Sequence, residues 1–152
     1  MDDALKRLIL KLLDQHRTMR IATLRPDGWP QVTTVGYANE GFAIYFLCGL
    51  DSQKAANLAR DNRVSLAIDD DTPQVMEITG LSMAARAQIL ADEAEAAKVM
   101  ALLFARYPEQ KSLPGPMPKP SDVRIFRLTP VVISVLDYSR GFGHTDLVTY
   151  SA

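Results

Sequence analysis

The sequence contains a single cysteine, Cys48, among its 152 residues. One cysteine cannot form an internal disulfide, and it excludes a zinc site built on several cysteines. The formal net charge of −1 leaves no overall positive field for nucleic acid or an anionic membrane surface. No hydrophobic run approaches the roughly 18 residues needed to cross a bilayer. We therefore expect no nucleic-acid partner and no membrane association.

The amino terminus also lacks the features of a secretory signal, because the acidic Met1-Asp2-Asp3 is followed by an amphipathic stretch. A cytoplasmic location is the expectation. Hydrophobic residues make up 47% of the chain and charged residues 23%, both ordinary for a globular protein. A chain of this length fits one domain with a sizeable core. We expect a single domain over residues 1–152.

Helical and extended segments can be separated by their hydrophobic periods. Apolar residues recur every three or four positions over about residues 3–16, which predicts a helix, and further helices are predicted from Ser52 to about Asn62 and from Asp92 to Tyr107. Six or seven β-branched stretches bounded by turns predict strands at 19–24, 31–37, 42–48, 64–68, within 74–90, at 123–128 and at 131–138. This order predicts a mainly β fold with α additions, arranged as a small antiparallel barrel.

Three further features bear on this arrangement. Gly80 lies inside the long segment 74–90 and predicts a bulge or bend there. Residues 111–120 contain four prolines and one glycine, which predicts a stiff surface connection. Residues from about 137 to 152 form a C-terminal tail. Three successive aspartates at 69–71 are interpreted as a solvated loop, and no metal site is expected.

The first turn of the helix after the third predicted strand carries an unusual set of polar residues. Ser52 and Lys54 lie there, although a helix N-terminus carries partial positive charge and disfavours a lysine. Free backbone N–H groups, a capping hydroxyl and a cation are compatible when an anion such as a phosphate binds that turn. A solvated surface lysine is the alternative interpretation.

Several segments in this order resemble the FMN-binding split-barrel superfamily, the family of pyridoxamine 5′-phosphate oxidase and its relatives. The matching segments are MRIATL at 19–24, DGWPQVTTVGY at 27–37, IYF at 44–46, SQKAANLARDNRVSLAI at 52–68 and the strand through Gly80. The resemblance covers roughly residues 5–136. It implies a six- to seven-stranded antiparallel split β-barrel with flanking helices, and it implies FMN as the cofactor.

The resemblance also implies roles for individual residues. Ser52 and Lys54 match the hydroxyl and the cation that bind the flavin phosphate, and Gln53 replaces an arginine of the vitamin B6 oxidases. Gln31 and Thr34 would face the ribityl chain or the phosphate. The flavin and its phosphate tail would be lined by Arg20, Ile21, Ala22 and Thr23, and the isoalloxazine ring by Phe46, Leu47 and Cys48. For the apolar members of this set, a place in the barrel core is the alternative.

The family binds its flavin at the interface of a homodimer, so the resemblance implies a second copy as partner. Gln74, Val75 and Met76 are candidates, by position, for the second subunit's contribution to the site. Strands rich in Val, Ile and Thr often leave apolar faces for such a partner.

The C-terminal tail departs from the vitamin B6 oxidases, because their arginine- and tryptophan-bearing end motif is absent. It nevertheless concentrates aromatic and charged groups that can line a substrate pocket: Tyr138, Arg140, Phe142 and His144. We hypothesise that these side chains flank the reactive face of the flavin. An ordinary surface tail is the alternative.

Two classes of function follow. The first is an FMN-dependent oxidoreductase with an unassigned small-molecule substrate, in which the cofactor carries the electrons and no catalytic residue can be assigned. The second is a non-catalytic flavin-, deazaflavin- or haem-binding protein on the same fold, with His144 as an axial ligand in the haem version.

Overall fold

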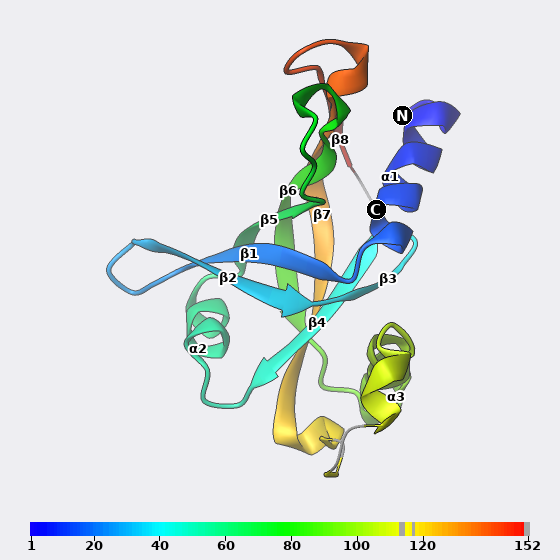
Figure 1. The fold of residues 1–152 in the computed structure, drawn as a ribbon. Coiled ribbons are helices and arrows are strands. Elements are labelled where there is room, and N and C mark those ends of the chain that lie inside the picture. Colours follow the sequence, from blue (N-terminus) through cyan, green and yellow to red (C-terminus); the bar gives the residue numbers. More distant parts are fainter. Residues whose placement is uncertain (113–114, 117, 151–152) are drawn as a thin grey trace.

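The computed structural model describes residues 1–112, 115–116 and 118–150. Within these ranges the chain forms three α-helices and eight strands (Figure 1). The helices are α1 (Asp3–Gln15), α2 (Gln53–Arg60) and α3 (Glu93–Ala105). The strands are β1 (Thr18–Leu24), β2 (Pro30–Gly36), β3 (Ala38–Glu40), β4 (Ala43–Gly49), β5 (Arg63–Asp69), β6 (Thr79–Ile89), β7 (Val123–Asp137) and β8 (Thr145–Thr149). Short 3₁₀ helices are η1 (Val75–Glu77), η2 (Pro108–Ser112), η3 (Pro120–Asp122) and η4 (Tyr138–Arg140).

The strands form one antiparallel sheet in the order β2-β1-β5-β6-β7-β4-β3, with β8 added beside β7. The sheet curves into a half-barrel whose two ends, β2 and β3, are joined by the short turn between Gly36 and Ala38. This arrangement confirms the predicted fold class, a split β-barrel with flanking helices, although the described residues contain eight strands rather than six or seven.

The structure differs from the expected strands in three places. The segments 123–128 and 131–138 are one continuous strand, β7, because Pro130 lies at a pairing irregularity where a missing N–H is tolerated. That register shift falls between Ala84 and Ala85, not at Gly80. The tail also contains a strand, β8, which pairs with β7 from Val132 to Leu136. The predicted stiff connection at 111–120 lies partly outside the described residues.

Gly80 is required for a different reason, which is close packing of the neighbouring strand. A Cβ atom added at Gly80 would lie 2.8 Å from the carbonyl oxygen of Ile68 on β5. A side chain there would therefore push β5 and β6 apart.

The core fills the inside of the half-barrel. Alternation along each strand turns one set of side chains inward, and α1 and α2 cover the open side. The inward residues include Met19 and Ile21 of β1, Phe46 of β4 and Leu128 of β7, all buried. Ile9, Leu12 and Leu13 supply the buried face of α1. A second cluster, with Tyr45 and Leu103 at its centre, joins α3 to the other face of β4.

Each α-helix begins at a side chain that caps it as the sequence predicts. The carboxylates of Asp2 and Asp92 accept hydrogen bonds from the backbone N–H groups of Leu5 and Glu95, at 2.8 and 2.9 Å. Such caps satisfy N–H groups that have no partner within the helix. No helix in the described ranges is long and apolar enough to cross a membrane.

Arg106, which follows α3, ties this helix to the end of α1. Its guanidinium donates to the carbonyl oxygens of Leu13 and His16 at 3.3 and 2.7 Å, and it lies over the ring of Tyr37. The Tyr37 hydroxyl donates to the same Leu13 carbonyl at 2.6 Å, and burial raises the pKa of this phenol. These contacts of Arg106 and Tyr37 fix the C-terminal end of α1 against the barrel.

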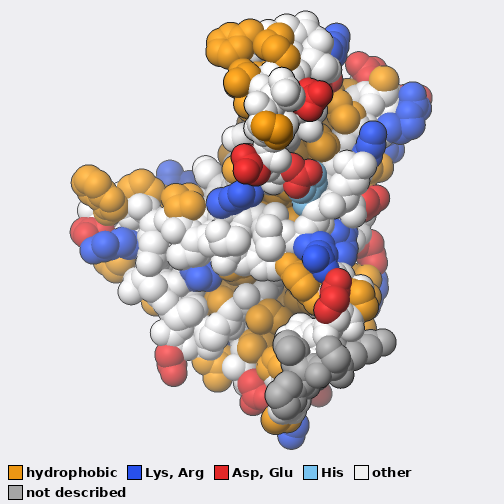
Figure 2. Space-filling view, in the orientation of Figure 1, with side chains coloured by type: hydrophobic (Ala, Val, Ile, Leu, Met, Phe, Trp, Pro, Cys, Tyr) orange, Lys and Arg blue, Asp and Glu red, His pale blue; other side chains and the backbone are white. Residues whose placement is uncertain are grey.

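Among the described residues, no helix covers the outer face of the sheet over β1, β5, β6 and the part of β7 that pairs with β8, from Val132 to Leu136. One register row across this face reads Arg20, Ala67, Ser82, Ser134 and Leu147. Two arms project beyond it (Figure 1): the β1–β2 hairpin, and the horn, which we define as residues 70–78 and 138–144. The two segments of the horn are joined where Tyr138 N–H donates to the Ile78 carbonyl at 2.9 Å. Figure 2 shows hydrophobic side chains gathered at the tips of both arms.

Candidate functional site

The barrel is split between β2 and β4. β2 ends the sheet and pairs only with β1, while β3 pairs with β4 only from Ala43 to Tyr45. Within the described residues, the edge of β2 and the edge of β4 from Phe46 to Gly49 therefore keep N–H and C=O groups outside the sheet ladder. Because α2 follows β4 after only a short turn, its first turn lies at one end of this split. We refer to the region between the two edges and α2 as the split site.

The first turn of α2 is arranged to receive an anion. Ser52 is the N-cap, and its Oγ accepts a hydrogen bond from Ala55 N–H at 3.2 Å. The backbone N–H groups of Gln53 and Lys54, at the start of the helix, have no acceptor within it. The Lys54 side chain is half-buried, and in the described part of the chain its ammonium has no hydrogen-bond or ion-pair partner. A cation and free N–H groups at a helix N-terminus together favour a bound phosphate.

A chain of side-chain hydrogen bonds fixes α2 to the hairpin. Gln53 Nε2 donates to Asn57 Oδ1 at 2.8 Å, and Asn57 Nδ2 donates to Thr23 Oγ1 at 2.9 Å and Gln31 Oε1 at 3.4 Å. Asn57 is fully buried, so these bonds satisfy a polar group that would otherwise be costly. The structure thus brings together Thr23, Gln31 and Gln53, three of the residues predicted for the site.

Thr33 of β2 is a further candidate site residue, which the sequence reasoning did not include. It shares a face with Gln31 because the two positions differ by two along the strand. Its hydroxyl is buried, yet it has no hydrogen-bond partner among the described residues. A buried hydroxyl without a partner in the protein is rare, so Thr33 is a candidate to contact a ligand. Alternation from Gln31 was the only available signal in the sequence.

Two hollows adjoin the split. One, of about 500 Å³, is lined by Gln31, Gln53 and the hairpin turn at Arg25, Pro26 and Asp27. The other, of about 180 Å³, has an apolar wall formed by Gly36, Leu47 and α3 residues including Leu103 and Phe104. A polar end beside a cationic helix terminus and an apolar end beside free strand edges suit a ligand with a phosphate tail and a flat ring.

Other predicted residues lie elsewhere. Arg20, Ala22 and Thr34 are on the outer face of the sheet, where the Arg20 guanidinium forms an ion pair with Asp69 at 2.6 Å. Arg20 and Lys54 are consequently on opposite faces of β1, because α2 packs on the face that carries Thr23. The structure does not bring these two predicted cations together.

The strand residues predicted beside the ring differ in their orientation. Ile21 and Phe46 are fully buried in the core, where Phe46 stacks on Phe126 with ring centroids 5.4 Å apart, and Cys48 is nearly so. Their side chains have no surface free for a ligand. Leu47 faces the apolar hollow instead. Phe46, Leu47 and Cys48 nevertheless lie along the free edge of β4, so their backbone groups border the split.

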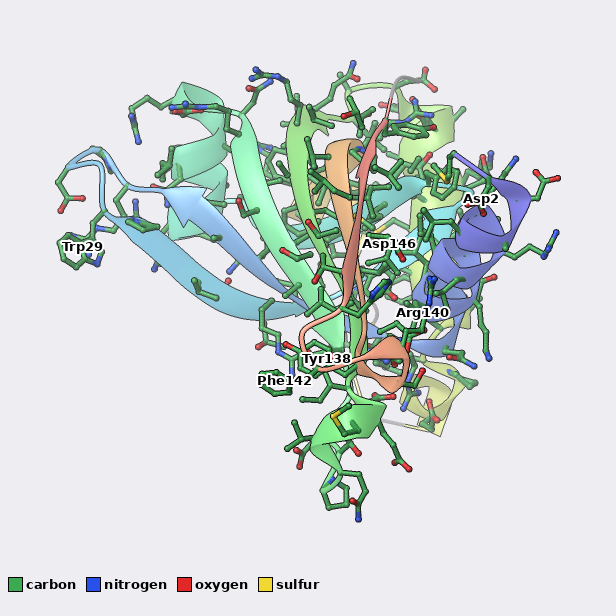
Figure 3. The ribbon with its side chains drawn as sticks, turned by 90° about the horizontal axis from the view of Figure 1, so that it is seen from above. Asp2, Trp29, Tyr138, Arg140, Phe142 and Asp146 are labelled. Atoms are coloured by element: carbon green, nitrogen blue, oxygen red, sulfur yellow. The ribbon has the colours of Figure 1, made fainter. Side chains whose placement is uncertain are left out.

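The tail residues separate into two pairs within the horn. Tyr138 and Phe142 pack edge to face, with centroids 5.6 Å apart (Figure 3). Arg140 and His144 both contact the Asp146 carboxylate, at 3.2 and 3.1 Å. Arg140 and Asp146 line a hollow of about 430 Å³ against the first turns of α1. The horn and α2 lie on opposite sides of the β1–β2 hairpin (Figure 1), so one protomer does not place its tail at its own split site.

A family model described as pyridoxamine 5′-phosphate oxidase matches residues 5–137. The matched region covers most of the chain, and together with the split barrel it defines the class. The chain belongs to the pyridoxamine 5′-phosphate oxidase family. No curated protein matches the sequence.

Solved structures with the same fold include proteins of different descriptions. Rv2991 from Mycobacterium tuberculosis is 25% identical, with a TM-score of 0.76, and the match covers 100% of this chain and 95% of that one. A haem-binding protein from Mycobacterium smegmatis is 20% identical, with a TM-score of 0.78 and coverage of 98% and 59%. The haem storage protein HutZ from Vibrio cholerae is 21% identical, with a TM-score of 0.64 and coverage of 82% and 88%.

Proposed function

We propose that the protein binds FMN in the split site, with the phosphate at the first turn of α2. The observation that carries this proposal is the combination of Lys54 of α2 and Thr33 of β2. Lys54 is half-buried and Thr33 has a buried hydroxyl, and neither the ammonium nor the hydroxyl has a partner among the described residues. A phosphorylated ligand would supply a negative charge for the Lys54 ammonium and a hydrogen-bond partner for the Thr33 hydroxyl. Gln53 stands where the vitamin B6 oxidases carry an arginine, and its side chain donates a hydrogen bond to Asn57. Lys54 is therefore the main positive charge at the first turn of α2.

The proposed activity is that of an oxidoreductase acting on a small planar or quinone-like substrate. When bound, FMN supplies the electron-transfer chemistry, and the chain supplies binding and orientation. Leu47 and the α3 side chains Leu103 and Phe104 provide a water-excluding wall at the apolar end. The unpaired edges of β2 and β4 offer backbone donors and acceptors to a polar ring edge.

We further propose a homodimer, with the second copy on the outer face of the sheet. This face leaves Val32 and Leu147 63% and 71% exposed, and the flanking arms expose Trp29 and Phe142 at 71% and 78%. Figure 3 shows Trp29 and Phe142 at the ends of the two arms. An exposed apolar area of this kind favours a protein partner. Val75 and Met76 on the horn are exposed as well, and they would reach a partner together with the tail.

The first experiment is the visible absorption spectrum of the purified protein, followed by titration with FMN and analytical ultracentrifugation. We expect a dimer that shows a two-band flavin spectrum as purified or takes up added FMN. NAD(P)H should reduce the bound flavin. A colourless protein that takes up no FMN would reject flavin binding. A deazaflavin spectrum would keep the split site and change the cofactor. A monomer at micromolar concentration would reject the proposed interface.

Haem binding is the second candidate, favoured by the pairing of His144 with Asp146. A carboxylate on one ring nitrogen fixes the tautomer and strengthens a histidine as a metal ligand, and here it leaves Nδ1 for the metal. Two proteins of this fold are described as haem-binding or haem storage proteins. Haem titration of the native protein and the H144A variant tests this candidate. It expects a Soret band that the variant loses; an identical band in both would remove His144 as the ligand.

A further inference from the structure

His16, at the C-terminal end of α1, is a buried histidine whose two ring nitrogens both contact acceptors. Its side chain is only 7% exposed. Nδ1 lies 2.6 Å from the carbonyl oxygen of Leu12, one turn earlier in the helix, and Nε2 lies 3.0 Å from a carboxylate oxygen of Asp70. A carbonyl and an ionised carboxylate accept hydrogens and donate none. Both ring nitrogens must therefore carry a proton when the two contacts are satisfied.

The contact with Asp70 depends on the charge of the His16 ring. A neutral imidazole has one N–H, and the Leu12 carbonyl uses it, so Nε2 would turn a lone pair toward the Asp70 carboxylate and repel it. The imidazolium satisfies both acceptors, and the carboxylate compensates its buried charge. Histidine changes charge between about pH 5 and 8. The contact is therefore present when the ring is protonated and is lost as the pH rises.

The other titratable groups on the segments around His16 leave Asp70 as its counter-ion. The Arg106 guanidinium donates to the His16 backbone carbonyl at 2.7 Å, and the phenol of Tyr37 stays neutral because burial raises its pKa. Asp71 adds an exposed carboxylate next to Asp70 in the chain. The remaining charges form ion pairs of their own, which are Arg106 with Asp14, Arg17 with Glu109, and Arg20 with Asp69.

Asp70 is the first residue of the horn, so its contact with His16 joins the horn to α1. The preceding side chain, Asp69, is on the outer face of the sheet, where it pairs with Arg20. Because side chains alternate along a strand, Asp70 turns to the opposite face, which α1 covers. In the described chain, no other hydrogen bond or ion pair joins residues 70–77 to a residue outside the horn.

We propose that His16 is a proton-dependent latch for the horn. The protonated ring holds residues 70–78 against α1 through Asp70, and the neutral ring releases them. The latch lies on the α1 side of the sheet, whereas the proposed second copy covers the outer face. It therefore operates whether or not FMN or a second copy is bound.

The latch sets the position of Val75 and Met76, which are exposed on the same segment of the horn. In the proposed homodimer these two side chains reach the second copy. Dimerisation should therefore weaken as the pH rises and His16 loses its proton. This consequence rests on the proposed function, whereas the latch itself does not.

NMR of the protein without added ligand, between about pH 5.5 and 8, tests the latch. We expect the backbone amide signals of Thr72 and Gln74 to shift with the same midpoint as the His16 ring, and their heteronuclear NOE to fall as the pH rises. D70N removes the charge and keeps the size of the side chain. In this variant the two amide signals should lose their pH dependence while the His16 ring still titrates. H16Q, which keeps an N–H donor, should remove the pH dependence as well.

The chain offers two matched controls. D71N removes the neighbouring carboxylate, and H144Q removes the second of the two histidines. Both variants should keep the pH dependence of Thr72 and Gln74. Amide signals that stay constant in the native protein, or that still titrate in D70N, would overturn the latch. Loss of the pH dependence in H144Q would assign it to His144 and overturn the latch as well.

Sedimentation of the native protein and D70N at both ends of this pH range tests the consequence for dimerisation. We expect the dimer to dissociate more readily at high pH in the native protein, and this difference should be absent in D70N. A monomer at every pH would reject the proposed homodimer and leave the NMR result to decide the latch. A native dimer whose affinity is independent of pH would show that the latch does not control dimerisation.

Discussion

Asn57 and Thr23, which are distant in sequence, meet through a 2.9 Å hydrogen bond inside the protein, where Asn57 is fully buried and Thr23 nearly so. N57A leaves the Thr23 hydroxyl and Gln31 without this donor, so we expect a loss of about 1–3 kcal/mol in the free energy of unfolding. Urea denaturation measures it. In a double-mutant cycle, T23V should lower the free energy of unfolding less in the N57A variant than in the native protein. The coupling free energy between the two substitutions should be about 0.5–3 kcal/mol. Strict additivity would contradict the assigned bond.

Lys54 should carry much of the affinity for FMN. K54A removes a charge-assisted contact to phosphate, so we expect binding to weaken by roughly 1.5–3 kcal/mol in a fluorescence titration. K11A, which removes an exposed lysine on α1, is the control and should bind FMN as the native protein does. Equal affinity for all three proteins would remove Lys54 from the site.

Thr33 permits a test in which stability and binding change in opposite directions. T33V removes a buried hydroxyl that has no partner, so the ligand-free protein should be unchanged or more stable by up to about 1–2 kcal/mol. If the hydroxyl contacts the ligand, the same variant should bind FMN more weakly. Thermal unfolding with and without FMN reports both quantities. A T33V protein that is destabilised without ligand would show that the hydroxyl has a partner within the fold.

Gly80 and Gly49 form a matched pair of glycines in strands. An added Cβ at Gly80 meets the Ile68 carbonyl at 2.8 Å, while the same atom at Gly49 meets nothing within 4 Å. We expect G80A to cost about 1–3 kcal/mol, because the obstacle is backbone that must move. G49A should be neutral or slightly stabilising, since it reduces the freedom of the unfolded chain. Chemical denaturation of both variants should show this difference, and equal midpoints would contradict the close packing of β5 on β6.

Asp61 makes stability depend on pH in the acid range. Side-chain hydrogen bonds from Arg63 lower the pKa of the Asp61 carboxyl from 3.8 to about 2. A folded-state pKa below the unfolded value stabilises the protein above the unfolded pKa, and this contribution is lost as pH falls through the folded pKa. The native protein should therefore exceed D61N in stability above about pH 4, and the difference should shrink toward pH 2. Urea midpoints of both proteins measured across this range give the comparison; a constant difference would contradict the assignment.

Local sequence signals identified most of the elements. Alternating apolar residues located the strands of the sheet, and Asp2, Ser52 and Asp92 located the helix starts, because caps act through the nearest N–H groups. The continuity of β7 was not predictable in this way. Proline normally interrupts a strand, and only the extra residue opposite Ala84 and Ala85 lets the chain pass Pro130 without losing the sheet. That compensation depends on a partner strand far away in the sequence.

The site was predicted only in part, for a related reason. Lys54 and Ser52 are recognisable because a helix N-terminus is a local feature. Arg20 was grouped with them by resemblance, yet strand alternation and the packing of α2 place it on the other face of β1. The unpaired hydroxyl of Thr33 could not be read from the sequence, because whether a donor lies nearby is decided by tertiary packing.

β7 lies between β6 and β4 and so joins the two halves of the barrel. Phe46 of β4 pairs with Phe126 of β7, which is 80 residues later in the sequence. The contacts that join the two halves of the barrel therefore have a large separation in sequence. Such pairings form slowly, because the entropy of a long loop is lost before the contacts between the strands stabilise the fold. During synthesis, a chain that has not reached Val123 holds β4 and β6 with exposed edges that can pair with another chain. The vulnerable period of this protein is thus its own translation, until β7 has left the ribosome.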